Sequence, residues 1–238
     1  MSSNFAEIIP TNTCPPNMIE LTRRSEAFST FATKIHLDIC DDIFAPVLSW
    51  PYHDTQWVEL QKMATDRQLL PYADAIFYET HLMVQDPLRI GELLARVGVR
   101  RILAHTEVFG DTQSIRSAFT IWKSAGASEV GLALLIDTPL SVLDPVIEDI
   151  DVVLLMSIPT LGKQGAPFDE RIFARIEELH ALHPELLIAV DGGVSDTNIA
   201  DLVRAGARRF GVGSAMSRAP DPSVTYQQLL KKAQCAVQ

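Results

Sequence analysis

His36 and Asp38 stand two residues apart in a short apolar run, K-I-H-L-D-I-C at residues 34–40. In a β-strand, residues i and i+2 point to the same face, so the imidazole and the carboxylate would project side by side. Burying both polar groups on one face costs free energy unless the pair has a function, such as binding a metal ion. An isolated H-x-D pair is more often a core histidine beside an edge carboxylate, so its meaning depends on partners from the rest of the chain.

The rest of the 238-residue chain alternates between apolar runs and helical patterns. The apolar runs, which we expect to be strands, lie at 6–10, 34–39, 73–84, 101–105, 130–136, 151–157, 186–191 and 208–212. Helical patterns follow at 15–31, 55–65, 86–97, 111–125, 139–147, 169–182, 196–205 (with Ser195 as its expected N-cap) and 223–233. Continuous apolar strands suit a parallel sheet that is buried on both faces. Eight such units favour a (β/α)8 TIM barrel in one domain, residues 1–238, over an open doubly wound sheet.

In a barrel of this kind the active site lies at the carboxyl ends of the strands. The polar residues near those ends, which we expect on one rim, are His36, Asp38, His81, His105, Glu107 and Asp191. Imidazole and carboxylate donors suit a borderline divalent ion such as zinc, iron(II), cobalt or manganese. Structural roles stay open for single members, because Asp191 could cap the following helix and His81 could be a hydrogen-bonded core histidine.

Glycines follow the last two expected strands, in D-G-G-V-S-D at 191–196 and G-V-G-S-A-M-S at 211–217. The loops after strands seven and eight of (β/α)8 barrels often hold a phosphate group. Glycines allow backbone N–H groups to approach an anion closely, and Ser214 could donate its hydroxyl. We therefore expect Gly192, Gly193, Gly213 and Ser214 to bind the phosphate of a small substrate.

Composition excludes several other classes of partner and location. The net charge of −10 argues against nucleic acid, whose phosphate backbone requires a basic footprint. No apolar run approaches the ~18 residues of a membrane span, and the N-terminus lacks the features of a signal peptide. The three cysteines are widely spaced and odd in number, which fits neither a disulfide framework nor a zinc knuckle. A reducing, cytoplasmic location is the expectation.

Seven segments, in order, resemble the ribulose-phosphate 3-epimerase family from Ile8 to about Pro222. They read I-H-L-D-I-C-D-D-I-F-A-P, T-H-L-M-V-Q-D-P, A-H-T-E, G-L-A-L-L-I-D-T-P-L, V-V-L-L-M-S, A-V-D-G-G-V and G-V-G-S-A. The resemblance implies a metal-dependent epimerase that inverts C3 of a ketose phosphate, by default between D-ribulose 5-phosphate and D-xylulose 5-phosphate. It also implies a homo-oligomer, either a dimer or a hexamer.

The same resemblance assigns roles to individual residues. It implies that one divalent ion, Zn, Fe(II), Mn or Co, is held by His36, Asp38, His81 and Asp191. Asp38 and Asp191 would also be the acid and base that move the proton at C3. Methionines that line the family's substrate site correspond to Met83 and Met156.

The chain departs from the family's pattern around the substrate. The family's glycine-rich loop after the sixth strand, N-P-G-F-G-G-Q, is I-P-T-L-G-K-Q-G at residues 158–165. We expect Gly162 and Lys163 to contact the substrate, the lysine as a point charge, although a solvated loop lysine is an equally open reading. The family's P-S-I-L is the more polar P-T-N-T at residues 10–13, where Thr11 is also expected to contact the substrate.

These departures leave two further hypotheses. The first is the same proton chemistry on another sugar phosphate, such as a tetrulose or hexulose phosphate. The second is a phosphosugar-binding protein without catalysis, although the retention of both Asp38 and Asp191 speaks against it. Barrel decarboxylases and aldolases are a weaker fit, because their D-x-K-x-x-D run has no counterpart at residues 38–42.

Overall fold

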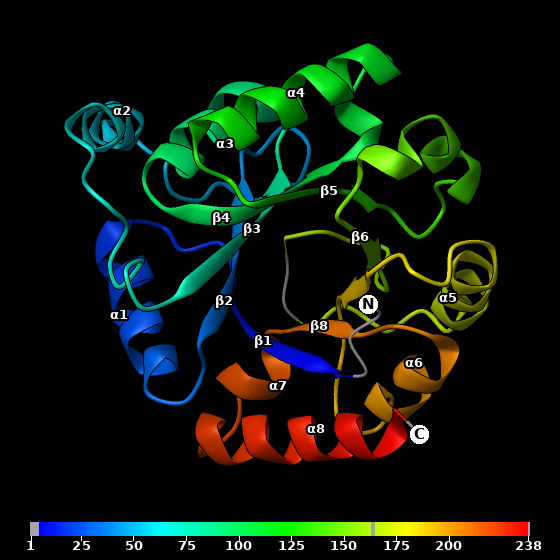
Figure 1. Cartoon of the computed structure of the whole chain (residues 1–238). Helices are drawn as coiled ribbons and strands as arrows, with labels where there is room; N and C mark the ends of the chain where they lie inside the picture. Colours follow the sequence, from blue (N-terminus) through cyan, green and yellow to red (C-terminus); the bar gives the residue numbers. More distant parts are fainter. Residues whose placement is uncertain (1–4, 163–164, 238) are drawn as a thin grey trace.

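Eight parallel strands form a closed barrel in the computed structural model, which describes residues 5–162 and 165–237. Each strand pairs with the next along the chain, and the first pairs with the last. Figure 1 shows the ring of strands with the helices arranged around it. The prediction of a (β/α)8 barrel is confirmed.

The elements alternate along the chain with few exceptions. The strands are β1 (Glu7–Asn12), β2 (Lys34–Cys40), β3 (Phe77–Met83), β4 (Val99–His105), β5 (Glu129–Leu134), β6 (Val152–Met156), β7 (Ile188–Asp191) and β8 (Arg209–Val212). The α-helices are α1 (Met18–Ser29), α2 (Gln56–Asp66), α3 (Pro87–Arg96), α4 (Thr112–Ala125), α5 (Arg171–Leu182), α6 (Ile199–Ala205), α7 (Ser214–Ser217) and α8 (Pro222–Ala236). Two 3-10 segments are η1 (Thr106–Val108) and η2 (Leu140–Asp149).

Alternation along each strand separates two buried regions. On β2, Ile35, Leu37 and Ile39 belong to the large core between the strands and the helices, and all three are fully buried. Cys40, on the opposite face, belongs to a smaller cluster inside the barrel. His36 and Asp38 share this inward face, because side chains two residues apart on a strand point the same way. The barrel therefore turns the polar residues of β2 inward and its apolar residues outward.

Three local features differ from the sequence-based expectations. The helix expected from 196 begins at Ile199, with Asn198 at the N-cap position, so Ser195 is not its cap. The segment after β5 is a 3-10 helix rather than an α-helix, and Pro145 inside it lacks the N–H that an α-helical hydrogen bond would need. The short helix α7 directly after β8 was not expected.

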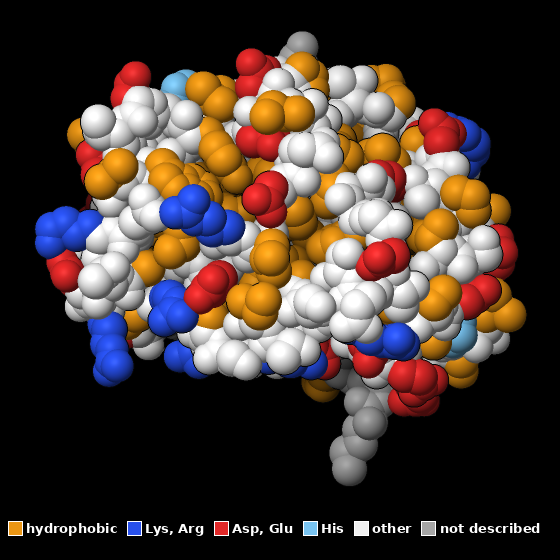
Figure 2. All heavy atoms as spheres, turned by 90° about the horizontal axis from the view of Figure 1, so that it is seen from above, with side chains coloured by type: hydrophobic (Ala, Val, Ile, Leu, Met, Phe, Trp, Pro, Cys, Tyr) orange, Lys and Arg blue, Asp and Glu red, His pale blue; other side chains and the backbone are white. Residues whose placement is uncertain are grey.

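The outer surface is mixed in character. Figure 2 shows one side of the molecule, where acidic and basic side chains are interspersed among apolar and neutral ones. Within residues 5–162 and 165–237, no helix combines the length and the apolar character that crossing a membrane requires.

Candidate active site

His36, Asp38, His81 and Asp191 converge inside the carboxyl end of the barrel. Asp38 on β2 is the direct neighbour of His81 on β3 in the strand register, and Asp191 ends β7. Donor atoms from the four side chains all lie within 4.8 Å of one another. The structure thus brings together four of the six residues that sequence analysis placed on one rim.

The spacing of these donor atoms fits a single metal ion. Asp38 Oδ1 lies 3.2 Å from His36 Nε2 and 3.4 Å from His81 Nδ1, and Asp191 Oδ2 lies 3.8 Å from the same His81 nitrogen. Four tetrahedral ligands about 2.0–2.1 Å from a zinc ion are roughly 3.3 Å apart. His36 Nε2, Asp38 Oδ1 and His81 Nδ1 are buried and have no hydrogen-bond partner among the described residues. Buried polar atoms without partners are costly, so the donor set suits a divalent cation.

His105 and Glu107, the other two rim residues, orient His81 rather than join the cluster. His105 Nδ1 lies 3.0 Å from Glu107 Oε2, and because a carboxylate only accepts, this nitrogen carries the proton. His105 Nε2 is then free to accept from His81 Nε2, 2.9 Å away. Burial lowers the pKa of His105 to about 4 although Glu107 opposes this, so its imidazole is neutral. Because His81 Nε2 faces His105, His81 Nδ1 is the ring nitrogen directed toward Asp38 and Asp191.

The charges of the two aspartates and of His36 differ because of their surroundings. Burial, together with the negative charge of Asp38, raises the pKa of Asp191 to about 6. Burial would raise the pKa of Asp38 as well, but close contacts with the His36 and His81 rings outweigh it and lower that pKa. Burial opposes the charge of His36, but Asp38 and Glu79 hold its pKa well above the usual range. Without a cation, Asp191 is therefore the aspartate that takes up a proton more readily.

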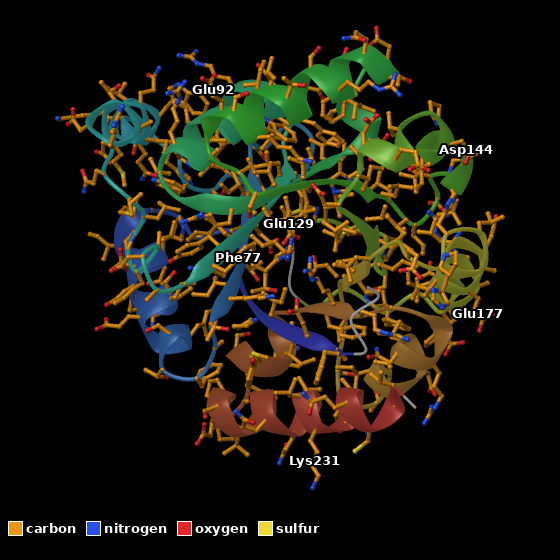
Figure 3. All side chains as sticks on the ribbon, in the orientation of Figure 1. Phe77, Glu92, Glu129, Asp144, Glu177 and Lys231 are labelled. Carbon is orange, nitrogen blue, oxygen red and sulfur yellow. The ribbon has the colours of Figure 1, made fainter. Side chains whose placement is uncertain are left out.

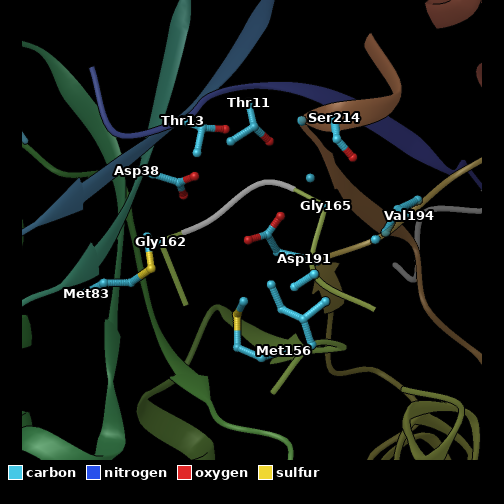
Figure 4. A pocket seen from close by; sticks show the side chains of 16 residues that line it. Thr11, Thr13, Asp38, Met83, Met156, Gly162, Gly165, Asp191, Val194 and Ser214 are labelled. Atoms are coloured by element: carbon cyan, nitrogen blue, oxygen red, sulfur yellow. The ribbon is translucent and has the colours of Figure 1, made fainter. Parts of the chain in front are cut away.

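A pocket above the cluster has the two aspartates on opposite walls, as Figure 4 shows. Met83 and Met156 line the same pocket. The other predicted substrate contacts that line it are Thr11, Gly162, Gly192, Gly193, Gly213 and Ser214. Lys163 lies outside the described residues. Apart from Lys163, the structure gathers every residue that was predicted to contact the substrate.

The comparisons with known proteins agree with this site. The sequence profile of the ribulose-phosphate 3 epimerase family matches residues 14–217. The chain belongs to this family. It is 30% identical over 207 residues to the ribulose-phosphate 3-epimerase of Buchnera aphidicola, covering 85% of this chain and 83% of the relative. It is also 30% identical over 202 residues to the Escherichia coli K12 protein of that name, covering 83% and 82% of the two chains.

Solved structures with much lower identity share the fold alone. A 3-keto-L-gulonate-6-phosphate decarboxylase from Vibrio cholerae superposes with a TM-score of 0.68 at 12% identity, covering 97% of this chain and 98% of the other. A 3-hexulose-6-phosphate synthase from Salmonella typhimurium gives 0.65 at 14% identity, with 97% and 99% coverage. Membership in the ribulose-phosphate 3-epimerase family makes this chain an isomerase-class enzyme, a sugar-phosphate epimerase.

A glycine after β7 and another on β8 make room for the site of this ribulose-phosphate 3-epimerase family member. Gly211 is the direct neighbour of Asp191 in the register, and a Cβ at Gly211 would lie 2.8 Å from Asp191 Oδ1. Gly192 has a φ of +103°, and a Cβ there would lie 2.6 Å from the Ile158 side chain. A side chain at either position would displace an atom of the pocket wall, which accounts for glycine at both.

Several residues around the site had not been assigned a role from the sequence. Those in the pocket wall are Thr13, Ile158, Gly165, Ala166, Val194 and Gly211. Below the cluster, buried Glu79 interacts both with His36 and with buried Arg101. A signal for both existed, because Glu79 stands two residues before His81 and Arg101 four before His105, which places them on the inward faces of β3 and β4.

A pair of thiols, Cys14 and Cys40, lies next to two residues that line the pocket, Met83 and Gly162. Cys40 ends β2 on the same inward face as His36 and Asp38, and its Sγ lies 3.1 Å from Cys14 Sγ and 3.9 Å from Met83 Sδ. Cys14 Sγ is in turn 3.9 Å from the carbonyl oxygen of Gly162, in the altered loop after β6. The altered loop after β6 therefore lies beside this thiol pair at Gly162, which lines the pocket.

Proposed function

We propose that this sugar-phosphate epimerase is metal-dependent and inverts C3 of a ketose phosphate, with D-ribulose 5-phosphate and D-xylulose 5-phosphate as the default pair. The observation that carries the proposal is the placement of two carboxylates, buried Asp38 and half-buried Asp191, on opposite walls of one pocket. A hydrogen on a sugar carbon can be removed from one face and replaced from the other only if proton-transfer groups lie on both sides.

The metal would be a divalent ion, Zn, Fe(II), Mn or Co, held by His36, Asp38, His81 and Asp191. When bound, such an ion polarises substrate oxygens and so stabilises negative charge that develops next to the carbon that loses its proton. His36 and His81 contribute imidazole donors, and the His105–Glu107 relay keeps the Nδ1 lone pair of His81 directed at the cluster. All four ligands come from rigid strands, so the donor set is organised before any ion arrives.

Asp38 and Asp191 would act as the acid and base. The C3 proton of a 2-ketose phosphate is acidified by the adjacent carbonyl, and one carboxylate removes it to leave an enediolate. The opposite carboxylic acid returns a proton to the other face of C3, which inverts that centre and leaves the proton count unchanged. The two groups need different protonation states at the start, and close carboxylates in different surroundings readily differ in this way.

The rest of the pocket would hold the substrate. We propose that backbone N–H groups at Gly192, Gly193 and Gly213 and the Ser214 hydroxyl bind the phosphate. Among the described residues, Thr11, Met83, Met156 and Gly162 would contact the sugar. Lys163 remains a prediction from the sequence. A homo-oligomer, a dimer or a hexamer, also remains a proposal.

A second candidate is the same chemistry on a different sugar phosphate. It is favoured by the altered loop at Gly162, which lines the pocket and lies next to the thiols of Cys14 and Cys40. A panel of four-, five- and six-carbon ketose phosphates separates the two candidates. Turnover of the pentulose phosphate at least as fast as of any other compound would exclude the second.

The metal ligands can be tested without measuring activity. His36→Ala and His81→Ala should each lower the affinity for zinc by more than the roughly 10- to 100-fold that outer-shell changes cost, because each removes a donor atom. His183→Ala, at the end of α5 and away from the cluster, is the matched control and should bind zinc like the wild type. Zinc content after dialysis, measured by atomic absorption, reports the result. Unchanged content in both ligand variants would remove these histidines from the site.

A further inference from the structure

His36 rests against a buried ion pair. Its Nδ1 lies 2.5 Å from Glu79 Oε1, and the other oxygen of Glu79 is paired with Arg101. In the strand register Glu79 is the direct neighbour of His36 on β2 and of Arg101 on β4. All three side chains are buried, with exposed fractions of 0%, 2% and 0% for His36, Glu79 and Arg101.

Arg101 is held in place by groups on the side away from the metal cluster. Its Nε donates to Glu129 at 2.8 Å, and Arg209 donates to the same carboxylate at 3.1 Å. The guanidinium carbon of Arg101 lies 5.0 Å from the centre of the Phe77 ring, which adds a cation–π contact. Figure 3 shows Glu129 and Phe77 near the middle of the ring of strands. A chain of charged groups therefore runs from His36 down the inside of the barrel.

The polarity of these hydrogen bonds determines which nitrogen of His36 can bind a metal. Glu79 is a carboxylate that only accepts, so the nitrogen facing it, Nδ1, carries a proton. The other nitrogen, Nε2, faces Asp38 at 3.2 Å and is the atom that belongs to the cluster. A carboxylate behind a ligating imidazole fixes the ring orientation and tautomer and makes the imidazole a stronger donor.

We propose that Glu79, held by Arg101, is a positioning residue that fixes His36 with its Nε2 directed at the metal. The proposal deepens the proposed function and rests on it, since it assumes that the four-residue cluster binds a divalent ion. In this arrangement each histidine ligand is oriented by a pair of hydrogen-bonded residues. His105 and Glu107 orient His81. Glu79 and Arg101 orient His36. The competing explanation is that the Glu79–Arg101 pair serves only the stability of the barrel.

Glu79→Gln tests the proposal because the glutamine amide favours one orientation between Arg101 and His36. Glutamine has one acceptor oxygen, whereas Glu79 serves two donors, His36 Nδ1–H and the Arg101 guanidinium. The charged guanidinium takes the oxygen, since hydrogen bonds with ionised partners are the stronger ones. The amide N–H then faces His36 Nδ1 and places the imidazole proton on Nε2, the nitrogen that should bind the ion.

The measurement is the affinity for Zn²⁺, by competition with a chromophoric chelator at fixed pH. Glu79→Gln should weaken binding by about 10- to 100-fold. Glu129→Gln is the matched control, because its amide oxygen can still accept from Arg101 and Arg209 and it touches none of the four ligands, so its zinc affinity should equal that of the wild type. In a His36→Ala background, Glu79→Gln should cause no further loss, because its effect passes through His36.

A second variant covers the case in which Glu79→Gln fails to fold with Arg101 left unpaired. Glu79→Met/Arg101→Met removes both buried charges and leaves no acceptor for His36 Nδ1–H, and it too should lose zinc affinity relative to the wild type. In zinc-loaded wild-type protein, ¹⁵N NMR of the histidines should show a protonated Nδ1 on His36, and neither Glu79 variant should retain that signal unchanged.

Two outcomes would overturn the proposal. One is zinc affinity in both Glu79 variants within twofold of the Glu129→Gln control. The other is an undiminished effect of Glu79→Gln in the His36→Ala background. Wild-type protein that binds no divalent ion would instead overturn the proposed function itself, so the two failures are distinguishable.

Discussion

Asp38→Asn and Asp191→Asn are each expected to slow epimerisation by about 10²- to 10⁴-fold, the usual contribution of a positioned acid or base. Asparagine keeps the shape and one oxygen donor of aspartate but cannot take up the C3 proton. Rates should be measured at saturating metal, because both residues also belong to the four-residue cluster. Asp144→Asn is a matched control, since it makes the same change on an exposed part of η2 and should leave the rate unchanged.

The two variants also separate a two-base mechanism from a one-base mechanism. With one carboxylate left, C3 hydrogen can still be removed and returned on a single face. Each variant should therefore exchange deuterium into one epimer and not the other, and the two variants should prefer opposite epimers. Near-normal epimerisation in either variant would contradict the two-carboxylate mechanism.

Arg101→Met is expected to destabilise the fold by about 3–5 kcal/mol, because it leaves Glu79 buried without its ion-pair partner. For a chain of this size that corresponds to a fall in Tm of roughly 6–20 °C. Arg116→Met is the control, because its pair with Asp149 is 49% and 40% exposed, and such surface pairs contribute about 1 kcal/mol or less. Urea denaturation followed by circular dichroism measures both, and equal losses of stability would contradict the account.

The barrel and the four-residue cluster were predictable because both follow from local patterns. Strand alternation places His36 and Asp38 on one face, and a parallel barrel brings all strand ends to one rim. Once eight strand–helix units were recognised, His81 and Asp191 had to lie near that pair. The prediction of a metal site follows from the side-chain types, since imidazole and carboxylate groups at one rim are typical metal ligands.

The residues that orient the two histidines of the cluster were not predictable in the same way. The contact between Glu79 and Arg101 depends on the exact register of β3 against β4, which contains an irregularity between Tyr78 and Glu79. Likewise, whether His105 binds a metal or orients His81 depends on ring geometry across two strands. Helix starts such as Asn198 in place of Ser195 depend on the turn that precedes the helix, which hydrophobic spacing does not determine.

Hydrogen exchange at C3, followed by NMR in deuterated water, is the decisive test of metal-dependent epimerisation by this protein. Purified protein with known metal content would be offered four-, five- and six-carbon ketose phosphates, with a chelator-treated sample alongside. We expect deuterium at C3 and formation of the C3 epimer, fastest with the pentulose phosphate and lost on chelation. Exchange with another sugar alone would support the same proton transfer at C3 but would assign the enzyme a different substrate. No exchange with any of these compounds, in protein that holds its metal, would contradict the proposed function.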